Sequence, residues 1–409
     1  MITTNGRSEK QQTLVSTDHT ETTGQQVPSR SRLRTVLRLL LATVASIVGV
    51  ILIGVLVLLI KSPGKLEPLK DAYGNVIPGS ISEKVWVEIG GIKQGMFIRG
   101  ENLGNPLVLY LHGGPGEPML QFISAIEKRE DYEHLEKYFT ICYWDQRGSG
   151  MTYTSSTEPS SLTLAQMVED TREVTEYLKT RFGQDKIYLI GQSWGTYLGV
   201  KTIEQYPENY LAYIGIGQAV NTTESERLAY DYMLRHAIET NDTEVIADLE
   251  KYDMRTFPWF NENDLTWLYY IAKTRTPILN EYGVGRMREG VYMQDILKTF
   301  FDFEGYTLWE KINWFLGEDM SMVQLFPVVL RDDLAASSTT FAIPFYIVHG
   351  VHDYVTSLVI AEQYFDIVEA PKKGFYRFEN SAHSPNLEEP AAFVALIRSI
   401  AAENLEEER

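Results

Sequence analysis

Hydrophobic positions fall into two patterns along the chain. Near the N-terminus, the 22 residues from Leu39 to Ile60 include no charged residue and no proline. From residue 84 onward, short apolar runs rich in β-branched and aromatic residues alternate with helical stretches. This alternation is typical of a mostly parallel sheet covered by helices, so the sequence predicts an α/β fold.

The apolar runs predict the strands. The first two, 85–89 and 96–99, flank Gly90-Gly91 and are predicted to form a hairpin. The later runs are short, apolar and followed by polar or glycine-rich turns, as in a buried parallel sheet. Functional groups of such sheets gather at the carboxyl ends of the strands, so those turns are where chemistry is expected. The later runs are 107–111, 139–143, 187–190, 213–216, 345–348 and 374–378.

The interval 221–340 interrupts this rhythm. It contains helical and aromatic-rich stretches without strand-like runs, which predicts a helical cap inserted into a core formed by residues 83–220 and 341–409. Residues 61–82 contain three prolines and three glycines and are predicted to be a linker. Residues 1–29, rich in Thr, Ser and Gln, are predicted to be a disordered tail.

The long apolar run predicts a membrane anchor. As a helix, the stretch 39–60 would be roughly 33 Å long, which matches the hydrocarbon core of a bilayer. It is longer than the apolar core of a cleaved signal peptide, so we predict an uncleaved single-pass anchor over residues 36–60 that contacts lipid through 39–60. Four arginines before the run and three lysines after it favour a cytoplasmic N-terminus, with the catalytic domain outside.

Charge and cysteine content exclude several classes of protein. The 409 residues include 37 Lys and Arg against 55 Asp and Glu, a net charge of −18. The first 61 residues carry +4 and the remainder −22, which argues against binding nucleic acid. The single cysteine, Cys142, excludes an intramolecular disulfide and any site with several cysteine ligands. No residue pattern suggests a metal or a cofactor, and none indicates the oligomeric state.

The sharpest chemical motif is Gly191-Gln192-Ser193-Trp194-Gly195. It lies directly between a predicted strand, 187–190, and a predicted helix, 196–206. A serine at such a sharp turn is lifted out of the sheet, and the flanking glycines allow the close backbone approach that the turn requires. Ser193 is therefore the candidate nucleophile.

A serine nucleophile needs a base, and the base needs a carboxylate to hold its tautomer. Asp353 follows the predicted strand 345–348, and His383 follows the last predicted strand. The order Ser193, Asp353, His383 is the one expected in an α/β-hydrolase. Three other aspartates are alternatives for the carboxylate: Asp332, Asp333 and Asp366. The remaining histidines fit the role of base less well than His383: His19, His112, His134, His236, His349 and His352.

A third motif, His112-Gly113-Gly114-Pro115-Gly116, follows the predicted strand 107–111. Glycines in such a loop let backbone N–H groups approach the oxyanion that forms during acyl transfer. We assign the oxyanion donors to the N–H groups of Gly114 and Trp194, and we expect His112 to hold the loop in shape.

Together with Trp144-Asp145-Gln146-Arg147-Gly148-Ser149-Gly150, these motifs resemble the proline iminopeptidase branch of the α/β-hydrolases, from about Gly79 to the C-terminus. The resemblance implies an eight-stranded sheet, no cofactor, and release of N-terminal proline or small residues from peptides. In the Trp144–Gly150 segment, Asp145 and Arg147 are expected to pair locally. The chain departs from the family at Gln192, where glycine is often found, and in its membrane span.

The resemblance also implies that acidic cap residues bind the free α-amine of the substrate. Glu224 and Glu226 are candidates, although Thr223 and Glu226 also have the spacing of a helix capping box. The leading prediction is therefore a membrane-anchored serine aminopeptidase. The alternatives are an esterase, lactonase or amidase acting on a small ester or amide, and a non-catalytic binding protein. Relatives with a carboxylate nucleophile are disfavoured because residue 193 is Ser.

Overall fold

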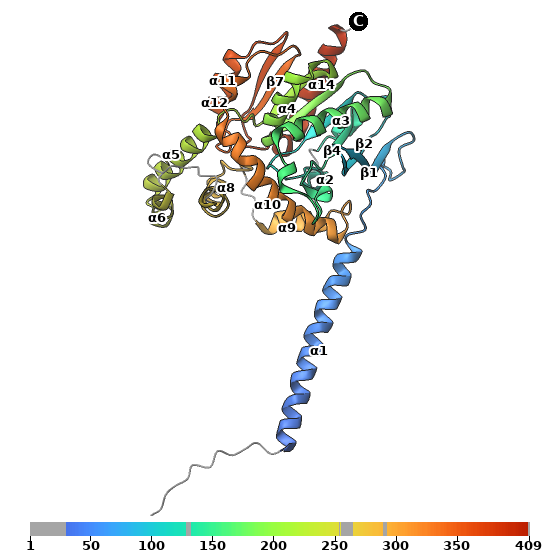
Figure 1. The fold of residues 1–409 in the computed structure, drawn as a ribbon, viewed down its shortest axis with the longest axis vertical. Coiled ribbons are helices and arrows are strands. Elements are labelled where there is room, and N and C mark those ends of the chain that lie inside the picture. The colour runs from blue at the N-terminus through green and yellow to red at the C-terminus, as the bar shows by residue number, and fades with distance from the viewer. Residues whose placement is uncertain (1–29, 128–131, 253, 255–264, 289–292, 408–409) are drawn as a thin grey trace, which may run out of the picture. The chain divides into compact units, whose positions relative to one another are not determined.

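The computed structural model describes residues 30–127, 132–252, 254, 265–288 and 293–407 (Figure 1). The predicted disordered tail, 1–29, lies outside the described residues. The chain divides into two compact units, Met1–Leu56 and Val57–Arg409. In the first unit lies most of the helix α1 (Arg30–Ile60), whose segment Arg34–Ile60 is long and apolar enough to cross a membrane.

The second unit is built on one sheet. Within the described residues, eight strands lie in the order β1-β2-β4-β3-β5-β6-β7-β8. β1 and β2 form the predicted antiparallel hairpin, β2 is also antiparallel to β4, and all other neighbours are parallel. The predicted mostly parallel, eight-stranded sheet is thus confirmed. The strands are β1 (Ile81–Ile89), β2 (Ile92–Gly100), β3 (Leu107–Leu111), β4 (Thr140–Trp144), β5 (Ile187–Gln192), β6 (Tyr210–Ile216), β7 (Phe345–Gly350) and β8 (Lys373–Phe378).

Helices cover both faces of the sheet because its central strands are apolar on both sides. In β3, Leu107, Leu109 and Leu111 face one apolar cluster, whereas Val108 and Tyr110 face the other. This alternation follows the two-residue period of a strand. The first cluster packs against α3 (Leu164–Phe182), α4 (Trp194–Gln205) and α12 (Leu358–Ile367), and the second against α2 (Leu120–Ile126) and α14 (Pro390–Glu407).

Between β6 and β7, the described residues form helices and no strand. These helices have their own apolar cluster, which includes Tyr230, Trp267 and Leu279. They occupy the interval predicted to be a cap. They are α5 (Thr222–Thr240), α6 (Thr243–Leu249), η5 (Glu250–Tyr252), α7 (Thr266–Tyr270), the π-helical η6 (Ile271–Arg275), α8 (Thr276–Glu281), α9 (Met293–Asp302), α10 (Leu308–Arg331) and α11 (Leu334–Ser337).

Short elements complete the described part of the chain. Four single turns of 3₁₀-helix and the helix α13 (Pro385–Glu388) connect the larger elements. Besides η5 in the cap, the 3₁₀ turns of the described residues are η1 (Leu135–Lys137), η2 (Gly150–Thr152), η3 (Pro159–Ser161) and η4 (Pro207–Asn209).

The first turn of α5 differs from the predicted capping box. The N-cap is Asn221, whose side chain accepts a hydrogen bond from the N–H of Glu224. The Thr223 hydroxyl instead donates to the carbonyl of Leu330, 2.7 Å away. The capping-box interpretation of Glu226 is therefore wrong, because the helix begins two residues earlier than that box requires.

Candidate active site

Ser193 stands on a sharp turn between β5 and α4. Its φ of +54° is a backbone conformation that few residues other than glycine adopt. A Cβ atom at Gly191 or Gly195 would collide with the carbonyls of Gly195 and Leu111, respectively. The turn is held by a 2.9 Å hydrogen bond from the N–H of Ser193 to the carbonyl of Ile216 on β6. Such a strained residue in a well-packed setting indicates a functional position.

Asp353 and His383 meet at the carboxyl ends of β7 and β8. The His383 Nδ1 atom lies 2.7 Å from the Asp353 Oδ2 atom, and both side chains are buried. The other carboxylate oxygen, Oδ1, accepts hydrogen bonds from the N–H groups of Val355 and Thr356, at 2.8 and 3.0 Å. Burial alone would raise the pKa of Asp353, but the His383 imidazole and the hydrogen bond from the N–H of Thr356 hold it below its ordinary value.

A second histidine, His349, contacts the same carboxylate. Its Nε2 atom lies 3.3 Å from Oδ2 of Asp353 and 3.0 Å from the carbonyl oxygen of Thr356. Burial lowers the pKa of His349, so the imidazole is neutral and its Nε2–H donates to these oxygens. This contact was not predicted from the sequence, because His349 was considered there only as a residue close to Asp353 along the chain.

One pocket joins Ser193 to the cap. It contains roughly 510 Å³ of empty space, part of which is open to solvent. Gly114 and Trp194, the two predicted oxyanion donors, line it beside Ser193. Since Trp194 is the first residue of α4, its N–H has no acceptor within the helix. The rest of the wall is mostly apolar: Ala219, Thr222, Ile271, Met322, Phe326, Val329, Val355 and Thr356, with Glu226 and Arg275 as its charged members.

Glu226 and Arg275 form a buried ion pair in this wall. Arg275 donates from Nη2 to Oε1 at 2.6 Å and from Nε to Oε2 at 3.1 Å, and both residues are less than 7 % exposed. Burial raises the pKa of Glu226 despite the opposing effect of Arg275. Arg275 was not among the predicted site residues, since 49 positions separate the two partners along the chain.

Glu224 lies in a different environment from Glu226. Its side chain is 42 % exposed and pairs with Arg227, one turn further along α5. This ion pair lowers the pKa of Glu224. Glu224 is not among the residues that line the pocket. Of the two predicted amine binders, only Glu226 is among the residues that line the pocket of Ser193.

His112 holds the glycine loop in shape. Its Nδ1 atom lies 2.9 Å from the carbonyl oxygen of Gly113, and its Nε2 atom accepts from the N–H of Gln146 at 3.3 Å. Burial lowers the pKa of His112 to about 4, so the ring stays neutral. This structural role agrees with the one predicted for His112.

Asp145 and Arg147 do not pair with each other, contrary to the prediction. Arg147 binds Asp170 on α3, with Nε–Oδ2 and Nη2–Oδ1 distances of 2.7 and 3.0 Å. Asp145 accepts hydrogen bonds from the N–H of Met151 and the hydroxyl of Tyr306, both at 2.8 Å, and burial raises its pKa to about 7. Arg147 therefore pairs with the fully buried carboxylate of Asp170 and not with Asp145 of its own motif.

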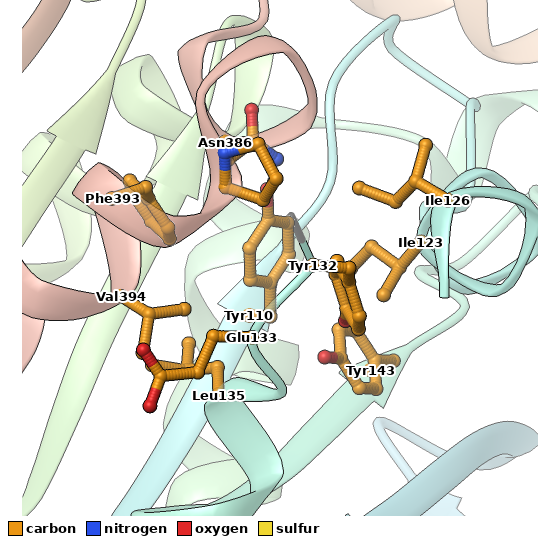
Figure 2. A pocket seen from close by; sticks show the side chains of 11 residues that line it. Tyr110, Ile123, Ile126, Tyr132, Glu133, Leu135, Tyr143, Asn386, Phe393 and Val394 are labelled. Atoms are coloured by element: carbon orange, nitrogen blue, oxygen red, sulfur yellow. The ribbon is translucent and has the colours of Figure 1, made fainter. Parts of the chain in front are cut away.

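Gln192, where the chain departs from the family pattern, is hydrogen-bonded to side chains on two other segments. Its Oε1 atom accepts from the hydroxyl of Tyr110 at 2.6 Å and from Asn386 Nδ2 at 3.4 Å. Tyr110 and Asn386 also line a separate pocket of about 360 Å³, part of which is open to solvent, and Figure 2 shows them side by side among mostly apolar and aromatic side chains. Ser193, Asp353 and His383 are not among the residues that line this second pocket.

Comparison with known proteins identifies the family of the chain. Residues 106–390 match a family model described as "alpha/beta hydrolase fold". The chain therefore belongs to the α/β-hydrolase family.

Within this family, the chain is similar to proteins named as aminopeptidases and proline iminopeptidases. A Bacillus subtilis (strain 168) protein named "Probable aminopeptidase YbaC" is 32 % identical over 308 residues, which cover 75 % of this chain and 92 % of that protein. The solved structure of proline iminopeptidase from Mycobacterium smegmatis covers 78 % of this chain and 98 % of its own, with 16 % identity and a TM-score of 0.56. A proline iminopeptidase-related protein from Thermus thermophilus covers 79 % and 98 %, with 18 % identity and a TM-score of 0.53. At these identities the two structures show a shared fold.

Proposed function

We propose that this protein is a membrane-anchored serine hydrolase that releases N-terminal proline or small residues from peptides. One observation carries the proposal: Ser193, on its strained turn, lines the same pocket as the two predicted oxyanion donors. The His383–Asp353 hydrogen bond of 2.7 Å supplies the oriented base that a serine nucleophile needs. The aminopeptidase relative supports the choice of a peptide substrate.

The proposed reaction runs through an acyl-enzyme. His383 takes the hydroxyl proton as the Ser193 oxygen attacks the scissile carbonyl carbon, and Asp353 stabilises the resulting imidazolium. The N–H groups of Gly114 and Trp194 stabilise the negative charge on the former carbonyl oxygen. The imidazolium then protonates the leaving amine, and the C–N bond breaks. Water, deprotonated by His383, attacks the acyl-enzyme and releases the acid and Ser193.

Asp353→Asn tests the proposed acid. We expect kcat to fall by roughly 10⁴-fold, because an amide holds the imidazole in the wrong tautomer. Asp366→Asn, a change at an exposed rival carboxylate, is the matched control and should keep wild-type activity. Steady-state kinetics of both variants check this, and equal loss in the two variants would contradict the assignment.

The low pKa of Asp353 also predicts how stability depends on pH. The carboxylate is more acidic in the folded protein than in the unfolded chain, so its contribution to stability is present above the unfolded value of about 3.9. That contribution is lost as the pH falls through the lower folded value. Denaturation of wild type and Asp353→Asn across acidic pH measures the difference.

Glu226 is the proposed partner of the substrate α-amine, because a buried ammonium needs a carboxylate. Glu226→Gln is expected to lower kcat/KM for a free-amine substrate by roughly 10- to 150-fold, since hydrogen bonds to charged groups contribute about 1.5–3 kcal/mol. Glu239→Gln, at an exposed position of the same helix, is the control. Unchanged turnover of a small ester by Glu226→Gln would show that its fold is intact. If the free-amine substrate were equally unaffected, Glu226 would not be the amine site.

An esterase, lactonase or amidase is the second candidate function. Two observations favour it: the pocket wall is mostly apolar, and the carboxylate of Glu226 is already paired with Arg275. A paired assay separates the two functions. Chromogenic Pro and Ala amides are compared with the same compounds acylated on the α-amine. Turnover lost on acylation supports the aminopeptidase, whereas equal turnover supports the alternative.

The membrane anchor is proposed on the length and composition of α1 alone. A cytoplasmic N-terminus would place the catalytic unit outside the membrane. Protease treatment of intact cells tests this orientation, because an outward-facing unit should be degraded. Survival of the unit in intact cells, with degradation only after permeabilisation, would reverse the topology.

A further inference from the structure

The exposed side of the first half of α10 is apolar. Trp309, Ile312, Phe315 and Leu316 are between 36 % and 66 % exposed. Their spacing of three and four residues puts them on one side of the helix. A helix that faces water normally presents charged or polar residues there. We call these four residues the α10 stripe.

The buried side of the same turns holds polar groups. The Lys311 ammonium is buried and donates to the carbonyls of Phe301, at 2.8 Å, and Lys61, at 3.3 Å. The Asn313 amide, also buried, donates to the carbonyl of Tyr153 at 3.0 Å. The buried side of this segment therefore combines these two polar groups with the core residue Trp314, while the exposed side is apolar.

The α10 stripe lies next to the point where the candidate span ends. Within the unit Val57–Arg409, the Lys61 ammonium pairs with Asp302 at the end of α9, at 2.7 Å. Pro63 forms a β-bridge with Thr307, the N-cap of α10. The residues that follow the span therefore contact the end of α9 and the start of α10, the helix that carries the stripe.

The α10 stripe fits the headgroup region in one orientation of the helix. From Trp309 to Leu316 the helix rises roughly 10 Å, whereas the headgroup region on each side of a bilayer is about 5–8 Å thick, so α10 would run along the membrane surface. Trp and Phe are enriched at this depth of a membrane. The stripe contains no basic residue, so its contact with lipid would depend on burial of apolar surface more than on attraction to anionic headgroups.

We infer that the α10 stripe lies in the headgroup region of the bilayer that holds α1, and that it holds the catalytic unit against the membrane surface. This inference rests on the proposed membrane anchor. Further along the same helix, Met322, Phe326 and Val329 line the pocket of Ser193. The pocket wall and the lipid contact would then share one helix, which favours substrates that partition into the interface.

Labels on the full chain test the inference. Single cysteines replace Trp309, Leu316, Leu52 in the span, or Val359, which is 54 % exposed on α12. The native Cys142 is buried, so an environment-sensitive fluorophore should react with the introduced thiol. Each labelled protein is reconstituted into phosphatidylcholine nanodiscs with or without lipids that carry a nitroxide quencher.

We expect labels at Trp309→Cys and Leu316→Cys to be blue-shifted and quenched by the nitroxide lipids, like Leu52→Cys and unlike Val359→Cys. If the two stripe labels match Val359→Cys while Leu52→Cys is quenched, the inference is overturned and the anchor stands. If Leu52→Cys is not quenched either, the anchor fails and the inference fails with it. Blue-shifted stripe labels without lipid quenching would indicate contact with protein and would also overturn the inference.

Discussion

Replacing Ser193 by Ala is expected to lower kcat by roughly 10⁴- to 10⁶-fold. The substitution removes only the hydroxyl oxygen, and without that oxygen no acyl-enzyme forms. The proposed oxyanion donors and the pocket remain, so hydrolysis should stay somewhat faster than in water. Because the backbone strain at this turn is unchanged, the variant should fold like the wild type.

Two measurements check this prediction. Steady-state turnover of a chromogenic Pro or Ala amide gives the loss in kcat, with Ser155→Ala at an exposed position as the control. A fluorophosphonate probe should label the wild type and Ser155→Ala but not Ser193→Ala. Identical labelling of all three proteins would refute Ser193 as the nucleophile. Absence of labelling and of turnover in the wild type would instead favour a non-catalytic binding protein.

Replacing Arg147 by Leu is expected to destabilise the fold by about 3–5 kcal/mol. Asp170 is fully buried, and besides Arg147 it accepts hydrogen bonds from Gln94 and Gln166, at 2.8 and 2.7 Å. Without the guanidinium, these two amides must stabilise a buried carboxylate alone. Arg147 also donates to the carbonyl of Gly90 at 2.8 Å, so the variant additionally loosens the β1–β2 turn.

Chemical denaturation monitored by tryptophan fluorescence measures this loss. Arg172→Ala breaks an ion pair with Glu169 that is more than a third exposed, and it should cost no more than about 1 kcal/mol. The double variant Arg147→Leu/Asp170→Leu should recover much of the stability, because it removes the uncompensated charge. If Arg147→Leu cost no more than Arg172→Ala, the ion pair would not be a major source of stability.

Local motifs could be predicted because each is encoded by adjacent residues. The glycines around Ser193 require a sharp strand-to-helix turn, and the structure shows that turn between β5 and α4. The apolar runs likewise predicted the strands to within a few residues, since strand pairing buries both faces of such runs. Asp353 and His383 were predicted from their places after two strands, and parallel strands bring those ends to one edge of the sheet.

Pairings between distant residues could not be predicted in the same way. Arg147 binds a carboxylate 23 positions away on α3 instead of Asp145 in its own motif. Similarly, Glu226 meets Arg275 across the cap, and His349 turns inward onto Asp353. Burial and three-dimensional geometry determine which groups a long side chain pairs with. The local sequence pattern contains no information about either.

The sequence by itself determined the family, the order of the candidate catalytic residues and the apolar N-terminal helix, because these follow from runs and motifs of adjacent residues. Only the tertiary structure decided which acidic cap residue lines the pocket of Ser193 and which surface of α10 is exposed. Lys311 points inward, where the carbonyls of Phe301 and Lys61 accept its hydrogen bonds, and Trp309 points outward. Such a choice depends on contacts between segments 250 positions apart, so no local pattern could have revealed it.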